Sequence, residues 1–123
     1  MKKILFIEDE AALQEAMGEA LVQHGYKVIK ALDGEIGLRL AKSENPDLIL
    51  LDLLLPNKDG FEVLEEIKKN EKIKDIPVIV LTNLEGMKDL EKALSFGATT
   101  YLVKTQYSLS EVLEKVKKAI EED

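Results

Sequence analysis

The 123-residue sequence predicts an α/β fold in which helices cover both faces of an open parallel sheet. Short β-branched or Leu-rich runs alternate five times with longer stretches in which apolar residues recur at helical spacing. The run Leu48 to Leu51 has no polar–apolar alternation, which is typical of a central strand buried on both faces. Because five strands are too few to close an eight-stranded barrel, we expect a doubly wound three-layer sandwich with right-handed crossovers.

Each expected strand is one of the short apolar runs. The strands are Lys3 to Ile7, Tyr26 to Lys30, Leu48 to Leu51, Val78 to Leu81 and Thr100 to Val103. In the flavodoxin-like strand order 2-1-3-4-5, the order reverses between the first and the third strand. Ligands bind such sheets outside the carboxyl ends of the strands, so polar side chains at those ends are candidates for a site.

Five helices are expected between and after the strands, each with apolar residues on one face. Their stripes are Leu13, Met17, Ala20 and Leu21; Ile36, Leu40 and Ala41; Phe61, Val63, Leu64 and Ile67; Met87, Leu90 and Leu94; and Leu109, Val112, Leu113, Val116 and Ile120. Gly25 should end the first helix in a left-handed conformation, Asn45-Pro46 the second and Gly97 the fourth. Ser108 or Ser110 is the expected N-cap of the fifth helix.

Composition and charge narrow the classes of function. The chain is 46% apolar and 33% charged, as is typical of a globular domain. It has no cysteine and one histidine, His24, so any metal must be held by oxygen. The formal charge of −7 opposes contact with phosphate backbones, so direct binding of nucleic acid is not expected. Since the sequence contains no membrane-length apolar run and no signal peptide, we expect a cytoplasmic protein without membrane contact.

Polar side chains follow four of the five expected strands. Glu8 and Asp9 follow the first strand, Asp52 the third, Thr82 the fourth and Lys104 the fifth. Because the carboxyl ends of parallel strands meet at one edge of a sheet, these groups should lie together. A carboxylate can act as a covalent phosphoryl acceptor, and an ionisable group directly after four buried apolar residues is costly unless it is paired. We therefore expect phosphoryl transfer onto Asp52.

The same positions match one known family in order along the chain. The matching pieces are the pair Glu8-Asp9, the run from Asp52 to Gly60, Thr82, Tyr101 and Lys104. A single Asp-x-x-x-Pro run is weak, whereas all of these pieces at successive strand ends are specific. The whole chain resembles a response-regulator receiver domain of two-component signalling, of the chemotaxis-receiver type. The resemblance implies a single receiver domain over residues 1–123, for which Met1 suggests a native start.

The resemblance implies a Mg²⁺ site around Asp52 as the phosphoacceptor. Asp9 and Asp52 would bind the ion directly, Glu8 through water, and Leu54 through its main-chain carbonyl. Three carboxylates repel an incoming phosphate dianion, so a cation must intervene. Mg²⁺ suits this task because it prefers hard oxygen ligands and usually binds one or two carboxylates together with phosphate oxygens.

The resemblance also implies roles for three further side chains. Thr82 and Lys104 would contact the phosphoryl group, and Thr82 with Tyr101 would form a switch that remodels the face of the fourth helix, fifth strand and fifth helix. That face would dock a downstream effector or a second copy in a homodimer. The phosphoryl group would come from a sensor histidine kinase or a histidine phosphotransfer protein. The domain would be a signalling domain rather than an enzyme, with self-phosphorylation from small donors and autodephosphorylation.

Three residues depart from the usual pattern of that family. Glu8 stands where an aspartate is more usual, a change that keeps metal binding. Asn83 follows Thr82 where a small residue is common, and its amide would narrow access and alter phosphorylation and hydrolysis rates. Thr105 follows Lys104 where a proline in a cis bond is usual, and a cis bond before another residue costs about 3–4 kcal/mol. A different loop conformation is therefore expected to place Lys104.

The sequence also allows other interpretations of these residues. A pseudo-receiver would keep the fold and act through protein contacts alone, although all five site residues are retained. A metal-dependent phosphatase would need a second aspartate at position 54, which is leucine, and a phosphate-cradling cofactor loop would be repelled by Glu8-Asp9-Glu10. Taken alone, the acidic pair suits the start of a helix, and Tyr101 suits a core or rim position.

Overall fold

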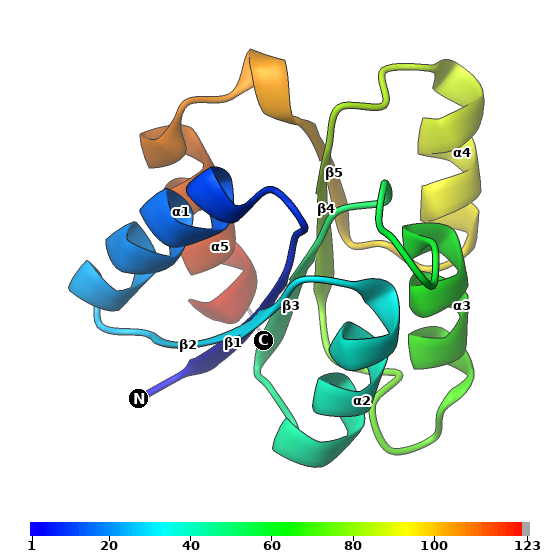
Figure 1. Cartoon of the computed structure of the whole chain (residues 1–123), viewed down its shortest axis with the longest axis horizontal. Helices are drawn as coiled ribbons and strands as arrows, with labels where there is room; N and C mark the ends of the chain where they lie inside the picture. The colour runs from blue at the N-terminus through cyan, green and yellow to red at the C-terminus, as the bar shows by residue number, and fades with distance from the viewer. Residues whose placement is uncertain (122–123) are drawn as a thin grey trace.

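A five-stranded parallel sheet forms the centre of the molecule (Figure 1). The computed structural model describes residues 1–121. The strands are β1 (Lys3–Ile7), β2 (Lys27–Ala31), β3 (Leu48–Leu51), β4 (Val78–Thr82) and β5 (Thr100–Val103). They pair in the order β2-β1-β3-β4-β5, with every neighbouring pair parallel. The predicted flavodoxin-like sandwich is confirmed.

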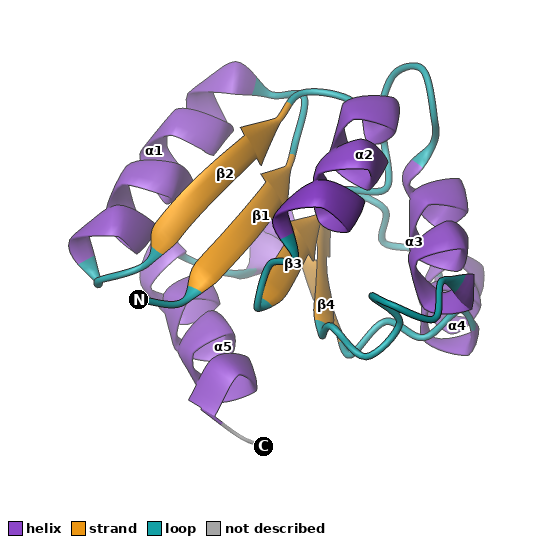
Figure 2. Cartoon of the chain, turned by 90° about the horizontal axis from the view of Figure 1, so that it is seen from below, coloured by secondary structure: helices purple, strands orange, loops and turns teal. Residues whose placement is uncertain are grey.

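Helices cover both faces of this sheet. They are α1 (Ala11–Gln23), α2 (Gly34–Glu44), α3 (Gly60–Lys69), α4 (Met87–Ser95) and α5 (Leu109–Glu121), with a short 3-10 helix η1 (Lys104–Gln106) after β5. Helices α1 and α5 lie on one face, and α2, α3 and α4 lie on the other (Figures 1 and 2). Within residues 1–121, none of the helices has the length and apolarity needed to cross a membrane.

The central strand β3 explains why its sequence shows no alternation. Successive side chains of a strand point to opposite faces. Leu48 and Leu50 pack with α1 and α5, whereas Ile49 and Leu51 pack with α2 and α3. All four are fully buried, so both sets must be apolar. The sheet therefore separates two hydrophobic cores, and its carboxyl edge is where polar side chains can gather.

The predicted apolar stripe of α4 is wrong at two of its three residues. The side chains of Met87 and Leu94 are 66% and 47% exposed, and Leu90 is only partly buried. The fully buried residue is Ala93, which joins the core under α4. On a nine-residue helix, more than one set of residues recurs at helical spacing. Only packing against the sheet selects the set that contains Ala93 as the buried face.

Helix ends follow the predicted chemistry with small shifts of boundary. Gly25 and Gly97 have φ angles of 92° and 103°, and Asn45 ends α2 with φ 46°. Ser108, and not Ser110, caps α5: its Oγ accepts a hydrogen bond from the Glu111 amide at 3.2 Å. The Glu111 carboxylate accepts one from the Ser108 amide at 2.8 Å, which completes a capping box. Strand β2 begins one residue later than predicted, and β4 extends by one residue to include Thr82.

Candidate functional site

Three buried polar side chains lie together at the carboxyl edge of the sheet. Glu8 follows β1, Asp52 follows β3 and Thr82 ends β4, and their exposed fractions are 0%, 2% and 0%. Main-chain hydrogen bonds continue past the strand ends, from the Asp52 amide to the Ile7 carbonyl and from the Glu8 amide to the Ala31 carbonyl, both at 3.0 Å. The sheet itself therefore positions the first residue beyond each central strand.

Glu8, Asp9 and Asp52 form a cluster of carboxylates. One oxygen from each lies within 4.8 Å of the others, with Asp9 exposed and the other two residues buried. The buried Oε1 atom of Glu8 lies 2.9 Å from Lys104 Nζ, although no donor within residues 1–121 meets it in hydrogen-bond geometry. Hard oxygen donors at this spacing, two of them on buried residues, fit a divalent cation such as Mg²⁺.

Lys104, the residue that follows β5, joins two carboxylates of this acidic cluster. Its Nζ donates hydrogen bonds to Glu8 Oε2 at 3.0 Å and to Asp52 Oδ2 at 2.9 Å. Burial lowers the pKa of Lys104, but the hydrogen bonds to Glu8 and Asp52 and their negative charges outweigh it, so the pKa lies above its ordinary value. The ammonium is therefore charged and supplies the positive charge of the site.

The surroundings of Glu8 strongly shift the pKa of its carboxyl group. Burial raises its pKa to about 7, and the nearby charge of Asp52 adds to this effect. Hydrogen bonds from Lys104 and from the Glu10 amide act in the opposite direction but do not cancel the burial. Asp52 thus favours the neutral form of Glu8 and Lys104 favours the ionised form. An additional cation would also favour the ionised form.

Thr82 and Tyr101 are joined through one residue of the loop between β4 and α4. The Thr82 Oγ1 atom accepts a hydrogen bond from the Leu84 amide at 3.4 Å. The Tyr101 hydroxyl donates one to the Leu84 carbonyl at 2.8 Å. Burial, followed by the charges of Asp89 and Asp52, raises the pKa of Tyr101, so its hydroxyl stays protonated as a donor. The Leu84 peptide units therefore connect the site to the half-buried aromatic side chain.

The remaining predicted residues surround this arrangement. Leu54 exposes half of its side chain, and its amide donates to Asp52 Oδ1 at 3.1 Å. Asn83 is exposed directly after Thr82. Lys104 begins the short helix η1, and the described chain contains no cis peptide bond. The loop that places Lys104 is therefore this single helical turn.

Sequence reasoning missed two contributors to the site. Glu10 lies with its Oε1 3.7 Å from Lys104 Nζ, and its amide donates to Glu8 Oε2 at 3.0 Å. Gln14 is 5% exposed and lies on the buried face of α1 with Met17 and Leu21. A polar residue within an apolar helical stripe is the signal that identifies such a position. No motif marks Glu10, because its contact depends on where η1 places Lys104.

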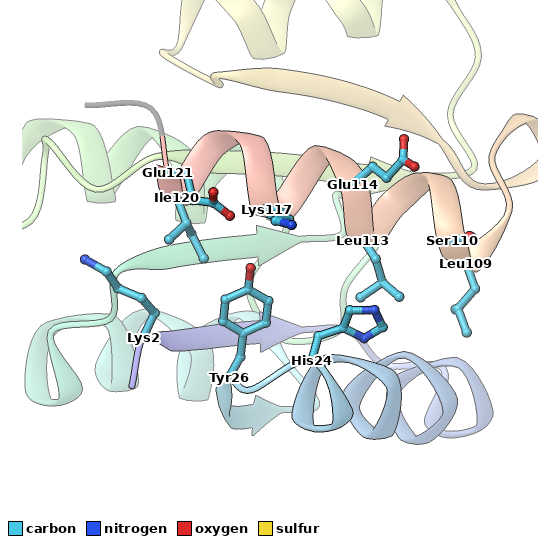
Figure 3. Close-up of a pocket in the computed structure, with 10 residues that line it drawn as sticks. All are labelled: Lys2, His24, Tyr26, Leu109, Ser110, Leu113, Glu114, Lys117, Ile120 and Glu121. Carbon is cyan, nitrogen blue, oxygen red and sulfur yellow. The ribbon is translucent and has the colours of Figure 1, made fainter.

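A separate pocket of about 1020 Å³ is lined by none of these site residues. Figure 3 shows it between the end of α1 and α5, lined by side chains that include His24, Tyr26, Leu113 and Ile120. The His24 Nδ1 atom lies 2.9 Å from the Ala20 carbonyl at the end of α1. The sole histidine thus lies at the C-terminal end of α1.

The chain also matches a known protein family whose members carry a site at this edge of the sheet. Residues 4–117 match the model of the response regulator receiver domain. The chain belongs to this family. Receiver domains are parts of two-component response regulators and act in signalling rather than as classical enzymes.

Known receivers resemble the chain in sequence and in structure. The DNA-binding dual master transcriptional regulator RpaA of Synechocystis sp. is 39% identical over 117 residues, covering 95% of this chain and 48% of RpaA. The chain therefore spans about half the length of the curated relatives it matches. A CheY-like receiver domain protein from Methanospirillum hungatei superposes with a TM-score of 0.92 at 29% identity, covering 99% of this chain and 95% of that one. The Mn²⁺-bound form of response regulator Rcp1 has a TM-score of 0.80 at 34% identity, with 98% and 90% coverage.

Proposed function

We propose that this receiver domain accepts a phosphoryl group on Asp52 in a Mg²⁺-dependent reaction, with residues 1–123 acting as one domain. The main support is the convergence of the Glu8, Asp9 and Asp52 carboxylates with the Lys104 ammonium at the carboxyl edge of the sheet. A buried carboxylate with cationic partners is suited to covalent phosphoryl chemistry, in which positioning and charge stabilisation dominate.

The acidic cluster is the proposed Mg²⁺ site. Asp9 and Asp52 would bind the ion directly, Glu8 through water, and Leu54 through its main-chain carbonyl. Bound Mg²⁺ would neutralise the carboxylates and hold phosphoryl oxygens beside Asp52. The spacing of the three carboxylates, with one oxygen from each within 4.8 Å of the others, supports this assignment. So does the Mn²⁺ in Rcp1, because that receiver is 34% identical to this chain.

Asp52 is the proposed nucleophile. One of its carboxylate oxygens attacks the phosphorus of a phosphohistidine in a histidine kinase or histidine phosphotransfer protein. An O–P bond forms as the P–N bond breaks, and the electron pair of the broken bond remains on the imidazole nitrogen. Lys104 Nζ, now 2.9 Å from Asp52 Oδ2, would move its hydrogen bond to a phosphoryl oxygen and stabilise the added charge. Small acyl phosphates would serve as donors, and water would later hydrolyse the aspartyl phosphate.

Thr82 and Tyr101 are the proposed switch. The Thr82 hydroxyl would turn toward a phosphoryl oxygen and so give up the 3.4 Å contact with the Leu84 amide. Because Tyr101 holds the carbonyl of the same residue, a shift at Leu84 reaches this aromatic side chain directly. The difference in contacts between the two states sets the coupling, commonly about 1–3 kcal/mol. Asn83, exposed beside Thr82, would modulate access to the acceptor.

The proposed partners are proteins. The charge of −7 disfavours contact of this domain with DNA, even though RpaA is itself DNA-binding. We therefore propose that, once Asp52 is phosphorylated, the face formed by α4, β5 and α5 docks a downstream effector or pairs with a second copy of the chain.

Intact-mass spectrometry after incubation with acetyl phosphate and Mg²⁺ tests this proposal. We expect one phosphoryl adduct on the native chain, none on Asp52→Ala, and none after chelation of the metal. Asp75→Ala, a change at an exposed aspartate away from the site, is the matched control and should retain the adduct. If Asp52→Ala still carries the adduct, Asp52 is not the acceptor. If the native chain forms no adduct and binds no beryllofluoride, the domain is a pseudo-receiver that acts through protein contacts alone.

A further inference from the structure

Gln14 is a buried polar side chain that the proposed chemistry does not use. Within residues 1–121, four polar or charged residues are buried, and three of them, Glu8, Asp52 and Thr82, belong to the site. The fourth is Gln14, in the first turn of α1. Burying an amide is costly unless hydrogen bonds compensate for the lost water, so its contacts should explain why it is there.

The Gln14 amide group faces three main-chain carbonyls. Its Nε2 lies 2.8 Å from the Ala31 oxygen, 3.2 Å from the Glu8 oxygen and 3.3 Å from the Phe6 oxygen. Carbonyl oxygens only accept hydrogen bonds, so the nitrogen of the side chain must face them. The Ala31 oxygen also accepts the Glu8 amide at 3.0 Å. Gln14 thus joins the end of β2 to the residue that follows β1.

These bonds hold Glu8 at both of its main-chain groups. Its N–H is bound by the Ala31 carbonyl, and its C=O is bound by Gln14. The Glu8 carbonyl belongs to the peptide unit that joins Glu8 to Asp9, and this unit is planar. Fixing that carbonyl therefore fixes the direction in which the chain enters Asp9. The Asp9 side chain itself is exposed.

We propose that Gln14 is a positioning residue that orients the Glu8–Asp9 peptide and so sets the affinity of the acidic cluster for Mg²⁺. This inference rests on the proposed function, because it concerns the same metal site. Within residues 1–121, the hydrogen bonds of the Gln14 side chain all go to main-chain carbonyls, so it acts through the main chain of the acidic pair. Groups that orient metal ligands commonly change metal affinity by about 10–100-fold when they are removed.

The test compares Gln14→Met with Leu21→Val in the full chain. Gln14→Met keeps the length of the side chain and removes its donors. Leu21→Val removes a methylene group from another buried residue of α1, and so serves as the control for lost stability. Calorimetric titration with MgCl₂ should show a Kd about tenfold higher than native for Gln14→Met and a native-like Kd for Leu21→Val. Thermal unfolding of both variants establishes that each is folded at the temperature of the titration.

Amide hydrogen exchange of the metal-free proteins gives a second readout. In Gln14→Met, the amides of Glu8 and Glu10, which donate to the Ala31 carbonyl and to Glu8 Oε2, should exchange about tenfold faster than in the native chain, whereas in Leu21→Val they should not. A native-like Mg²⁺ Kd in folded Gln14→Met overturns the inference, as does an equal loss of affinity in Leu21→Val. If Gln14→Met keeps full affinity while the native chain still binds Mg²⁺ and is phosphorylated, only the role of Gln14 is wrong. If the native chain binds no Mg²⁺, the proposed metal site itself fails.

Discussion

At the scale of single residues, the site is a balance between three carboxylates and one ammonium. Lys104 contributes two hydrogen bonds to buried acids from the far end of the chain, 96 and 52 residues away from its partners. Removing one member of such a set leaves buried charge without compensation. The positive charge that we propose prepares Asp52 for a phosphoryl group therefore also stabilises the metal-free domain.

We predict that Lys104→Met lowers the free energy of unfolding by about 2 kcal/mol without metal. This is less than the about 3–5 kcal/mol known for fully buried pairs, since Lys104 reaches solvent. Added Mg²⁺ should reduce the difference, because the ion binds the folded acidic cluster and offsets the lost charge. Urea unfolding with EDTA and with MgCl₂ measures both values. Lys118→Met, at an exposed position of α5, is the control, and a loss for Lys104→Met that Mg²⁺ leaves unchanged would contradict the prediction.

At the scale of elements, the start of α2 supports the loop that follows Asp52. Asp33 caps α2 by accepting the Ile36 amide at 2.8 Å, and its second oxygen accepts the Asn57 side-chain amide at 3.1 Å. Gly34 leaves no room for a side chain: a Cβ there would lie 1.9 Å from the Lys58 carbonyl oxygen. Two segments far apart in the sequence are thereby packed backbone to backbone.

Gly34→Ala should therefore destabilise the fold by about 1–3 kcal/mol, the usual range for overpacking, because main chain rather than a flexible side chain must move. Gly86→Ala is the matched control. A Cβ at Gly86, where φ is −67°, would meet only Asp89 Oδ2 at 3.2 Å, so its effect should lie within about 1 kcal/mol of zero. Thermal unfolding of the two variants decides this, and equal melting temperatures would show that the close approach at Gly34 is unimportant.

At the scale of the whole molecule, the five helices are anchored unequally. Helix α3 buries Gly60, Val63, Leu64 and Ile67, whereas α4 buries only Ala93 among its nine residues. Local opening is easiest where few apolar side chains leave water. The helix beside the Thr82–Leu84–Tyr101 connection is therefore also the one held most weakly by the core.

We predict that native-state hydrogen exchange is fastest, among the helices, in α4. Amides in the middle of α4 should exchange at least about tenfold faster than those of α3, a difference of about 1.4 kcal/mol in the free energy of opening. Exchange measured residue by residue by NMR provides the comparison within one sample, with α3 as the internal reference. Equal protection of the two helices would show that the burial of Ala93 alone anchors α4.

The strand order was that of the flavodoxin-like type of fold, but the class of fold and the edge at which Glu8, Asp52, Thr82 and Lys104 gather could be predicted from this sequence alone. These follow from local patterns: apolar runs, helical stripes, and the rule that parallel strands end at one edge. The structure was needed to show which stripe of α4 is buried and that Gln14 and Glu10 contact the residues of the site. Those outcomes depend on contacts between residues distant in the chain, such as Gln14 with Ala31 and Glu10 with Lys104. The choice of Ser108 over Ser110 as the cap of α5 is instead local, because Ser108 and Glu111 exchange hydrogen bonds across three residues. Packing selects among contacts that local periodicity leaves equivalent, which is the physical reason for the division.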